Sequence, residues 1–330
     1  MHAERAHGQR RELCRQGRSG ISFGLRSRRN QILYEGKASM SGKRAFGALY
    51  LRFLGGYAAL AGTRRAKEFD SRVRFGRRLD LNRPKTLADK ICWLELNNYR
   101  SNPLVIQCTS KADVRKYLKS KGLQTYLVPL VCEPWRNTSE IDIESLPNAF
   151  AMKAAHGCGM NRLVQNKSVE NLKELRTLAE RWLSKNYARA CVEPHYLGVG
   201  HAIICEELLA APEDMIDYKI HCMNGTARLI QTCSERCSKL KEGLYDTEWH
   251  PVSGLKDIEI KQALRPNNLA LMIELAQVVA QDFPYVRVDF YEVKEKVFFG
   301  ELTFTPATGV LPHFSDALVE KCGSFLELDI

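Results

Sequence analysis

Two acidic residues face each other in a predicted β-hairpin near the C-terminal end of the sequence. Residues 285–309 read YVRVDFYEVKEKVFFGELTFTPATG, and a tight turn centred on Glu295 places Asp289 directly across from Glu301. Opposed carboxylates repel each other unless a cation lies between them. A divalent metal with oxygen ligands is the usual solution, and Mg²⁺ carrying nucleotide phosphates is the commonest case. The pattern therefore predicts a magnesium site, with a solvated sheet face carrying a chance acidic pair as the alternative.

Two more polar side chains extend this face of the hairpin. The same register places Arg287 across from Thr303, two residues along each strand from the acidic pair. Strict alternation also places Phe299 on the face of Glu301, and Phe290 on the opposite face. The apolar residues that flank both strands indicate a buried hairpin with one polar side.

A second segment with chemical potential is residues 150–161, FAMKAAHGCGMN. Lys153 lies in the middle of a predicted strand, where a cation without a partner is costly. The glycine-bearing loop that follows can cradle phosphates with its backbone N–H groups, and a lysine beside it can neutralise them. The sequence contains neither GxxxxGK[ST] nor GxGxxG, so the alternatives are an ordinary turn and a lysine paired with a carboxylate. His156 either contacts a phosphate or acidic substrate, or caps the strand end.

The elements that must position these residues form a mixed set of helices and antiparallel strands. Asn224-Gly225 is a strong hairpin turn, and Thr86 is a predicted helix N-cap. Helices are predicted over 45–62, after Thr86, and over 111–121, 169–185 and 267–282. Strands are predicted over 126–132, 149–155, 162–165, 202–209, 218–223, 227–233, 285–293 and 297–304.

The order of these motifs resembles the ATP-grasp superfamily. Lys153 with its glycine loop is followed by Glu206-Glu207-Leu208, Asp217-Tyr218-Lys219 and the closing hairpin. The sequence is most similar to the TupA-like (teichuronopeptide-biosynthesis) ATP-grasp family. The motifs that carry this likeness also include Pro84-Lys85-Thr86, Ser110-Lys111, Leu146-Pro147 and Tyr245-Asp246-Thr247-Glu248-Trp249. The resemblance covers residues 83–328 and implies an α+β ATP-grasp fold, with the nucleotide held between two α+β subdomains that contain antiparallel sheets.

The resemblance also implies a role for each site residue. Lys111 and Lys153 would bind the phosphates of ATP, and Arg287 would act with Lys153 on the transferring phosphoryl group. Thr303 stands where the superfamily usually has a metal-binding asparagine, and its hydroxyl can still bind or orient a metal-bound water. The phosphate lid would be Gly157, Cys158 and Gly159; the adenine and ribose contacts would be Glu206, Glu207, Leu208 and Asp217; the Mg²⁺ ligands would be Asp289, Glu301 and Thr303.

The predicted domain organisation has five parts. They are a basic, disordered extension over 1–44, an apolar and basic helical lead-in over 45–78, an N-terminal α/β part over 79–148, a central ATP-grasp subdomain with a glycine-rich lid over 149–205, and a C-terminal ATP-grasp subdomain with the magnesium-binding hairpin over 206–330. The 330 residues are too many for one small module and fit two domains or one large α/β enzyme fold.

Basic charge is concentrated at the N-terminal end. The chain has a net charge of +11, and residues 1–45 contain eleven Lys or Arg and three Glu. The body is therefore nearly balanced, so nucleic acid is not an expected partner. For the extension, an overlong start before Met40, an organelle transit peptide and a nucleic-acid arm remain alternatives. The eleven loosely spaced cysteines indicate free thiols in a reducing cytoplasm rather than disulfides or a zinc site.

Residues 45–62, AFGALYLRFLGGYAALAG, are the longest apolar stretch. Eighteen residues are at the lower limit for spanning a bilayer, and Arg52 and several glycines weaken that interpretation. A buried or interfacial helix is favoured over a transmembrane one. Basic residues at both ends suit weak association with a membrane surface. The expected location is the cytoplasm, with peripheral contact at the inner face of the membrane.

The function that these observations predict is an ATP-dependent carboxylate–amine ligase with ATP and Mg²⁺ as cofactors. It would activate a carboxylate, on a small molecule or a polymer end, as an acylphosphate for attack by an amine or another nucleophile. The family name places this reaction in cell-surface polysaccharide or teichuronopeptide biosynthesis. The alternatives are a kinase acting on a sugar or polyol hydroxyl, and a non-enzymatic scaffold that binds polyanions through residues 1–65.

Overall fold

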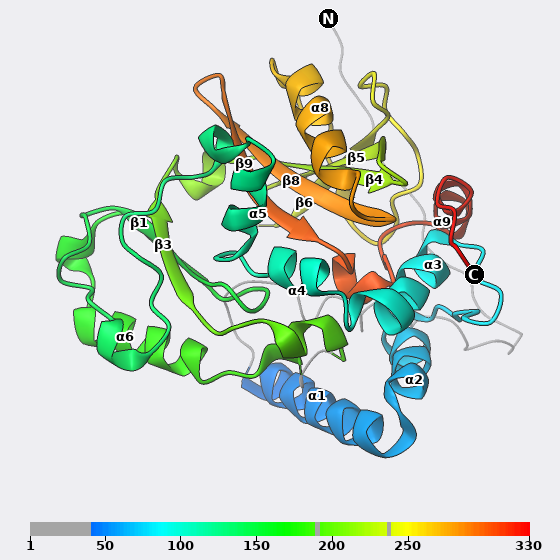
Figure 1. Ribbon diagram of the computed structural model, residues 1–330, viewed down its shortest axis with the longest axis horizontal. Coiled ribbons are helices and arrows are strands. Elements are labelled where there is room, and N and C mark those ends of the chain that lie inside the picture. The colour runs from blue at the N-terminus through cyan, green and yellow to red at the C-terminus, as the bar shows by residue number, and fades with distance from the viewer. Residues whose placement is uncertain (1–40, 189–191, 236–238) are drawn as a thin grey trace, which may run out of the picture.

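The computed structural model describes residues 41–188, 192–235 and 239–330 (Figure 1). Of the predicted extension over 1–44, residues 1–40 lie outside the described residues. The first helix begins at Ser41, four residues before the predicted lead-in. The five domain boundaries stay predictions.

Two antiparallel sheets dominate the fold. The smaller sheet has the strand order β2-β1-β3, and the larger has the order β7-β6-β5-β4-β8-β9. All neighbouring strands are antiparallel except β6 and β7. The strands are β1 (Phe150–Ala154), β2 (Asn161–Val164), β3 (Ile203–Glu207), β4 (Asp217–Met223), β5 (Thr226–Ser234), β6 (Lys241–Tyr245), β7 (Glu259–Ile260), β8 (Tyr285–Val293) and β9 (Lys296–Thr303). The α+β architecture with antiparallel sheets confirms the predicted fold class.

Helices surround and connect the two sheets. They are α1 (Ser41–Ala61), α2 (Thr63–Phe75), α3 (Leu87–Leu94), α4 (Pro103–Thr109), α5 (Val114–Ser120), α6 (Leu172–Leu183), α8 (Leu269–Ala280) and α9 (Asp316–Gly323). Helix α8 covers one face of the larger sheet, and the α4–α5 segment lies between the two sheets (Figure 1). The predicted N-cap at Thr86 is confirmed, because its hydroxyl accepts a hydrogen bond from the Asp89 N–H. Among the described residues, no helix combines the length and apolar character that crossing a membrane requires.

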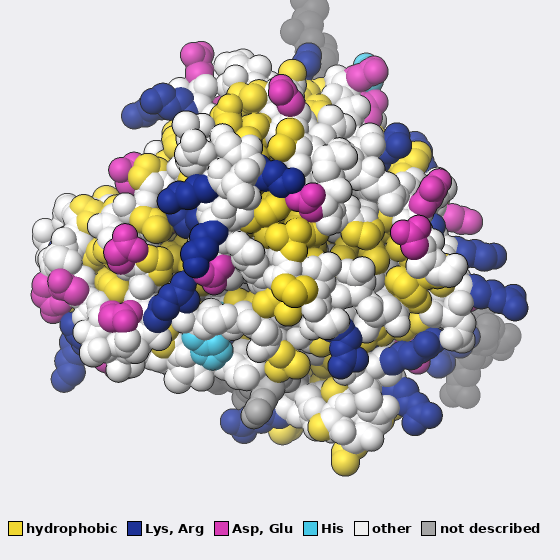
Figure 2. Space-filling view, in the orientation of Figure 1, with side chains coloured by type: hydrophobic (Ala, Val, Ile, Leu, Met, Phe, Trp, Pro, Cys, Tyr) yellow, Lys and Arg dark blue, Asp and Glu magenta, His cyan; other side chains and the backbone are white. Residues whose placement is uncertain are grey.

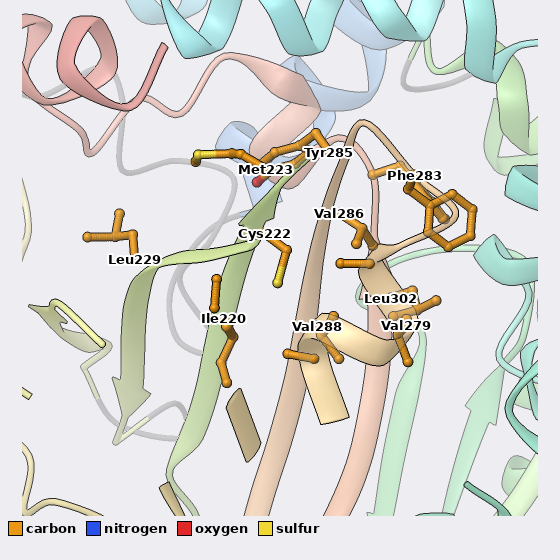
Figure 3. Packing of buried hydrophobic residues seen from close by; sticks show 14 of the residues in the cluster. Ile220, Cys222, Met223, Leu229, Val279, Phe283, Tyr285, Val286, Val288 and Leu302 are labelled. Carbon is orange, nitrogen blue, oxygen red and sulfur yellow. The ribbon is translucent and has the colours of Figure 1, made fainter. Parts of the chain in front are cut away.

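The main core lies between α8 and the larger sheet. Val288 of β8, Leu302 of β9 and Ile220 of β4 point to this side together with Val279 of α8 (Figure 3). A separate core, which includes Phe150 and Trp182, supports the smaller sheet. Because each sheet has its own apolar core, the polar faces of the two sheets are free to form a site between them.

Two sequence predictions about strands are wrong. Residues 126–132 form no strand, because Pro129 has no N–H to donate. The segment makes single bridges instead, from Leu127 to Phe299 and from Leu130 to Glu206. Phe299 pairs with Phe290 rather than lying beside Glu301, since a β-bulge at Gly300 shifts the register. The bulge brings both rings into the core and leaves the polar register beyond it intact.

The loop after β9 is tied to the lead-in helices. Lys67 of α2 is buried, pairs with Glu95 at 2.6 Å, and donates a hydrogen bond to the Thr308 carbonyl at 3.0 Å. Arg77, just after α2, donates to three carbonyls of the same loop, at Val310 (2.8 Å), Leu311 (3.3 Å) and Phe314 (2.7 Å). Ala307, Thr308 and Leu311 have positive φ angles. These donors therefore hold a backbone conformation that non-glycine residues rarely adopt.

Candidate nucleotide site between the two sheets

The hairpin β8–β9 has the register that the sequence predicts at its polar end. Asp289 lies opposite Glu301, and Arg287 lies opposite Thr303. The two-residue turn is Lys294-Glu295, with positive φ at both residues. The bulge at Gly300 begins one residue before Glu301, so it separates the core part of the hairpin from its polar part.

Asp289 is neutralised by the protein itself. Its side chain is only 2% exposed, and both of its oxygens accept hydrogen bonds from Arg287, at 2.6 Å and 2.8 Å. Lys219, which lies opposite Asp289 on strand β4, forms an ion pair with the same carboxylate. Two cations therefore surround one buried carboxylate, and the repulsion expected for a bare acidic pair is removed.

Glu301 is the more accessible carboxylate of the pair. Its side chain is 33% exposed, and its oxygens lie 3.1 Å from the Lys111 ammonium and 3.6 Å from the Arg287 guanidinium. Burial raises the pKa of Glu301, but the positive charges of Lys111, Lys219 and Arg287 lower it by more. The net pKa of Glu301 is therefore well below its usual range. Glu301 is therefore ionised at neutral pH. Thr303 completes the group, accepting from Arg287 at 3.0 Å and donating to Glu301 at 3.4 Å.

This donor set fits Mg²⁺. Magnesium binds hard oxygen ligands and takes one or two protein carboxylates, with phosphate and water oxygens completing its octahedron. Glu301 offers an ionised, partly exposed carboxylate, whereas Asp289, beside it in register, would have to exchange a contact with Arg287 or Lys219 to bind a metal. Among the described residues no cluster of three or more His, Cys, Asp or Glu could hold a metal without such outside ligands. The geometry suits a metal that arrives with a nucleotide.

Lys153 of the smaller sheet has a carboxylate partner. Its ammonium lies 2.6 Å from Glu206 of the neighbouring strand β3, and Arg115 approaches the same carboxylate at 3.5 Å. The side chain of Lys153 remains partly exposed. This ion pair is the one expected if Lys153 only balances the charge of a nearby carboxylate. The exposed part of the Lys153 side chain can still be reached by a phosphate.

Lys111 joins the two sheets. Its ammonium donates to the Gly157 carbonyl in the loop of the smaller sheet at 3.2 Å and pairs with Glu301 of the larger sheet at 3.1 Å. Burial lowers the pKa of Lys111, but the charges of Glu301 and Glu206 outweigh this effect, so the net pKa is raised. A single cation therefore contacts both the glycine loop and the predicted metal ligand.

The glycine loop between β1 and β2 is shaped by its glycines. Gly159 has a φ of +70°, and a Cβ on Gly157 would overlap Met160 and lie 2.9 Å from the Tyr187 ring. Cys158 between them is exposed. These positions therefore need glycine, and the loop turns its backbone rather than bulky side chains toward the site.

His156 does not face the loop's open side. Its Nε2 lies 2.9 Å from the Trp182 carbonyl, its Nδ1 accepts from the Ala202 N–H at 3.4 Å, and its ring stacks on His201 at 4.0 Å. The side chain is buried, and burial followed by the neighbouring His201 lowers its pKa. Of the two alternatives for His156, the structure supports capping of the strand end.

Residues 89–326 match the sequence model described as TupA-like ATPgrasp. The chain belongs to the TupA-like ATP-grasp family. It is therefore an ATP-grasp enzyme. A search of curated proteins by sequence gave no match.

Solved structures of low similarity include two D-alanine–D-alanine ligases and a D-cycloserine synthetase. D-alanine–D-alanine ligase from Helicobacter pylori has 12% identity and a TM-score of 0.41, over 74% of this chain and 67% of that chain. D-cycloserine synthetase has 11% identity and a TM-score of 0.41, over 69% and 74%. D-alanine–D-alanine ligase from Bacillus anthracis, complexed with ATP, has 10% identity and a TM-score of 0.39, over 66% and 68%. The family assignment rests on the sequence match.

In this ATP-grasp enzyme the remaining predicted residues lie along the connection between the sheets. Glu207 ends β3, is exposed, and donates its N–H to the Pro129 carbonyl at 3.0 Å. Leu208 follows directly and is partly exposed. Asp217 begins β4, where it is buried 3.9 Å from the Lys219 ammonium. The segment from Glu206 to Asp217 therefore links the Lys153 pair to the Asp289 group.

Sequence reasoning missed two cations of the site. Lys219 belongs to the quoted Asp217-Tyr218-Lys219 motif but received no role, and Arg115 was not considered as a partner of Glu206. The signal for Lys219 was its spacing: in a strand, Asp217, Lys219 and His221 must share one face. Nothing local to Arg115 indicates its partner, because Glu206 is far away in the sequence.

Proposed function

We propose that this ATP-grasp enzyme joins a carboxylate to an amine in two steps at the junction of the two sheets. The observation that carries the proposal is Lys111, which bonds to the glycine loop and to Glu301 at once. A nucleotide lying between the sheets would place its phosphates at this junction. ATP and Mg²⁺ are the proposed cofactors.

The chemistry follows from charge placement. In the first step an oxygen of the substrate carboxylate attacks the γ-phosphorus, the bond to the β,γ-bridging oxygen breaks, and ADP leaves with that electron pair. In the second step the amine nitrogen attacks the acyl carbon, inorganic phosphate leaves, and the nitrogen loses a proton. Such reactions depend on positioning and charge neutralisation more than on covalent catalysis.

Individual residues would divide these tasks. Lys111 and Lys153 would bind phosphate oxygens, and the backbone of Gly157, Cys158 and Gly159 would close over them. Arg287, held in place by Asp289 and Thr303, would orient the transferring phosphoryl group. Mg²⁺, when bound by Asp289, Glu301 and Thr303, supplies further positive charge at the phosphates. Glu206, Glu207 and Leu208 would border the adenine, and Asp217 would accept a ribose hydroxyl.

The substrates are proposed by class. The donor is a carboxylate on a small molecule or a polymer end, and the acceptor is an amine. Biosynthesis of a cell-surface polymer built from acidic sugars and amino acids, such as a teichuronopeptide, would supply both groups. Since ATP is a cytoplasmic cofactor, the proposed location is the cytoplasm, at or near the inner face of the membrane.

The test measures ADP and phosphate released by the full chain with ATP–Mg²⁺ and panels of amino acids and uronic acids. Tight ATP binding should first raise thermal stability, by about 2.7 kcal/mol at one hundred times the dissociation constant. Release of both ADP and phosphate only when carboxylate and amine are both present supports the ligase. ADP release with a phosphorylated sugar or polyol would establish the kinase instead. Polyanion binding without any ATP-induced stabilisation would leave only the scaffold.

A further inference from the structure

Helix α1 has one buried face and one exposed apolar face. Leu54 is fully buried against α2 and Val192, and Tyr57 packs on Phe69 of α2 with ring centroids 5.5 Å apart. Beside this contact, Leu49, Phe53 and Leu60 are 65%, 53% and 91% exposed. Spacings of four and seven residues place these three side chains on the same face of the helix. Apolar surface is therefore displayed as a continuous stripe, which we call the α1 stripe (Leu49, Phe53 and Leu60).

Positive charge surrounds the α1 stripe. Helix α1 contains no acidic residue, and residues 41–75 contain eight basic and two acidic residues. Both acidic residues are paired within α2, Glu68 with Arg64 at 3.2 Å and Asp70 with Arg74. Exposed basic residues of α1 and α2 include Arg52, Arg64, Arg65 and Arg72, and Arg64 is the one that pairs with Glu68. A partner of the stripe must therefore be apolar at its centre and anionic at its edges.

The position of the α1–α2 hairpin, formed by these two consecutive helices, suits a flat partner. Helices α1 and α2 lie at one edge of the molecule, away from α8 and the hairpin β8–β9 (Figure 1). In Figure 2 hydrophobic side chains at this lower edge lie between Lys and Arg side chains. From Leu49 to Leu60 the stripe is about 16 Å long, since a helix rises about 1.5 Å per residue. At roughly 10 Å wide it falls far short of the ~800 Å² that each partner buries in a stable protein interface.

We propose that the α1–α2 hairpin docks on an anionic lipid bilayer. The α1 stripe enters the boundary between headgroups and acyl chains, and the surrounding arginines contact lipid phosphates. The helix lies in the plane of the bilayer rather than crossing it. This surface is separate from the nucleotide site, so docking does not depend on the proposed reaction.

The experiment measures co-sedimentation of the full chain with vesicles of phosphatidylcholine alone and of phosphatidylcholine with phosphatidylglycerol. Wild type should bind the anionic vesicles, bind the neutral ones weakly, and dissociate as salt rises. Leu49→Ser with Leu60→Ser should lower the partition coefficient at least about tenfold, since both side chains are solvent-exposed and would enter the bilayer. Phe53 is left unchanged because its ring also packs on Tyr57 and Phe69.

The matched control is Val169→Ser with Leu264→Ser, at side chains 80% and 87% exposed on other parts of the chain. It should bind as wild type does. Arg52→Gln with Arg65→Gln should reduce binding to anionic vesicles only. Equal binding of wild type and the α1-stripe variant would overturn the proposal, because the basic residues 1–40 are present in both. A wild-type dimer that dissociates in the α1-stripe variant, seen by light scattering, would assign the stripe to a second copy instead.

Discussion

The two sheets differ in how completely their charged side chains are paired and buried. On the larger sheet Asp289 is buried between Lys219 and Arg287, and these three charges pair with one another on the same sheet. On the smaller sheet Lys153 is partly exposed, and its partner Glu206 is shared with Arg115 from the α4–α5 segment. The first group is fixed by folding. The second leaves a cation available to a ligand, beside a loop built on glycines.

This difference separates scaffolding from binding. A buried, fully paired carboxylate costs much to disturb, because removal of one partner leaves an uncompensated charge in a low dielectric. In the Lys153–Glu206 pair the lysine is partly exposed and the glutamate keeps Arg115 as a second cation, so the lysine costs less to disturb and can exchange its partner for a phosphate. We therefore expect substitutions on the larger sheet to affect stability first, and those at the sheet junction to affect ligand binding first.

Asp289→Asn should have the largest effect. It removes the buried carboxylate that Lys219 and Arg287 share and leaves them only the more distant Asp217, at 3.9 Å, and Glu301, at 3.6 Å, so the free energy of unfolding should fall by about 3–5 kcal/mol. Urea denaturation of the nucleotide-free protein measures this. The control is Asp282→Asn, which removes a partly exposed partner of Lys121 and should cost less than about 1 kcal/mol. Equal losses in the two variants would contradict the contrast between buried and exposed pairs.

Lys111→Met should chiefly weaken nucleotide binding. The Lys111 ammonium forms an ion pair with Glu301 and a hydrogen bond with the glycine loop. Within the described residues no other ammonium makes both contacts, and the substitution removes it. The affinity for ATP–Mg²⁺ should fall by about 1.5–3 kcal/mol, the range for a charged hydrogen bond, as measured by isothermal titration. Lys121→Met, which removes an ion-paired lysine of similar exposure, should leave affinity unchanged. If both variants bind ATP as wild type does, Lys111 is only a structural link.

Lys153→Met should reduce ATP affinity by roughly tenfold, about 1.4 kcal/mol, with little change in the empty protein. Stability is retained because Arg115 stays close to Glu206. Melting temperatures of wild type and variant, each with and without ATP–Mg²⁺, distinguish the two roles of this lysine. A variant that melts lower when empty but gains as much from ATP as wild type would remove Lys153 from the nucleotide site.

Glu301→Gln should lower the stability of the empty protein only modestly at neutral pH. Opposed carboxylates suggest relief of repulsion, whereas the structure surrounds Glu301 with cations that hold its pKa low. Because the pKa of Glu301 is lower in the folded than in the unfolded state, its ionised form stabilises the folded protein. This stabilisation is complete above the unfolded pKa of about 4.3 and is lost as the pH falls through the folded-state pKa. The variant should thus be less stable at pH 7, and the difference should shrink below about pH 4.3. A difference that grows on acidification in urea titrations would show the opposite sign.

Local patterns predicted most of the elements because each signal is contained in a few residues. The polar register of β8–β9 and the turn at Asn224-Gly225 follow from strand alternation and turn chemistry. The bulge at Gly300 had a local signal, because an isolated glycine inside a strand suggests a bulge, but strict alternation along the strand ignores that signal. Pro129 was present in the sequence, yet the apolar run around it outweighed that signal.

The candidate site was predictable residue by residue but not as a network. Asp289, Glu301 and Lys153 are identifiable from their own strands. The pairing of Lys111 with Glu301 joins residues far apart in the chain, and only the meeting of the two sheets brings them together. Neutralisation of Asp289 by Lys219 was likewise invisible, because strand order is set by the whole fold.

The contacts of Lys67 and Arg77 with the loop after β9 have a consequence for the unit that folds. The family match begins at residue 89, beyond both side chains. A fragment cut at that point would lack four hydrogen-bond donations to the carbonyls of Thr308, Val310, Leu311 and Phe314. The segment that follows β9 would lose its anchor while the strand itself stayed intact. The smallest cooperative unit therefore begins upstream of the residues that match the family, at or before helix α2.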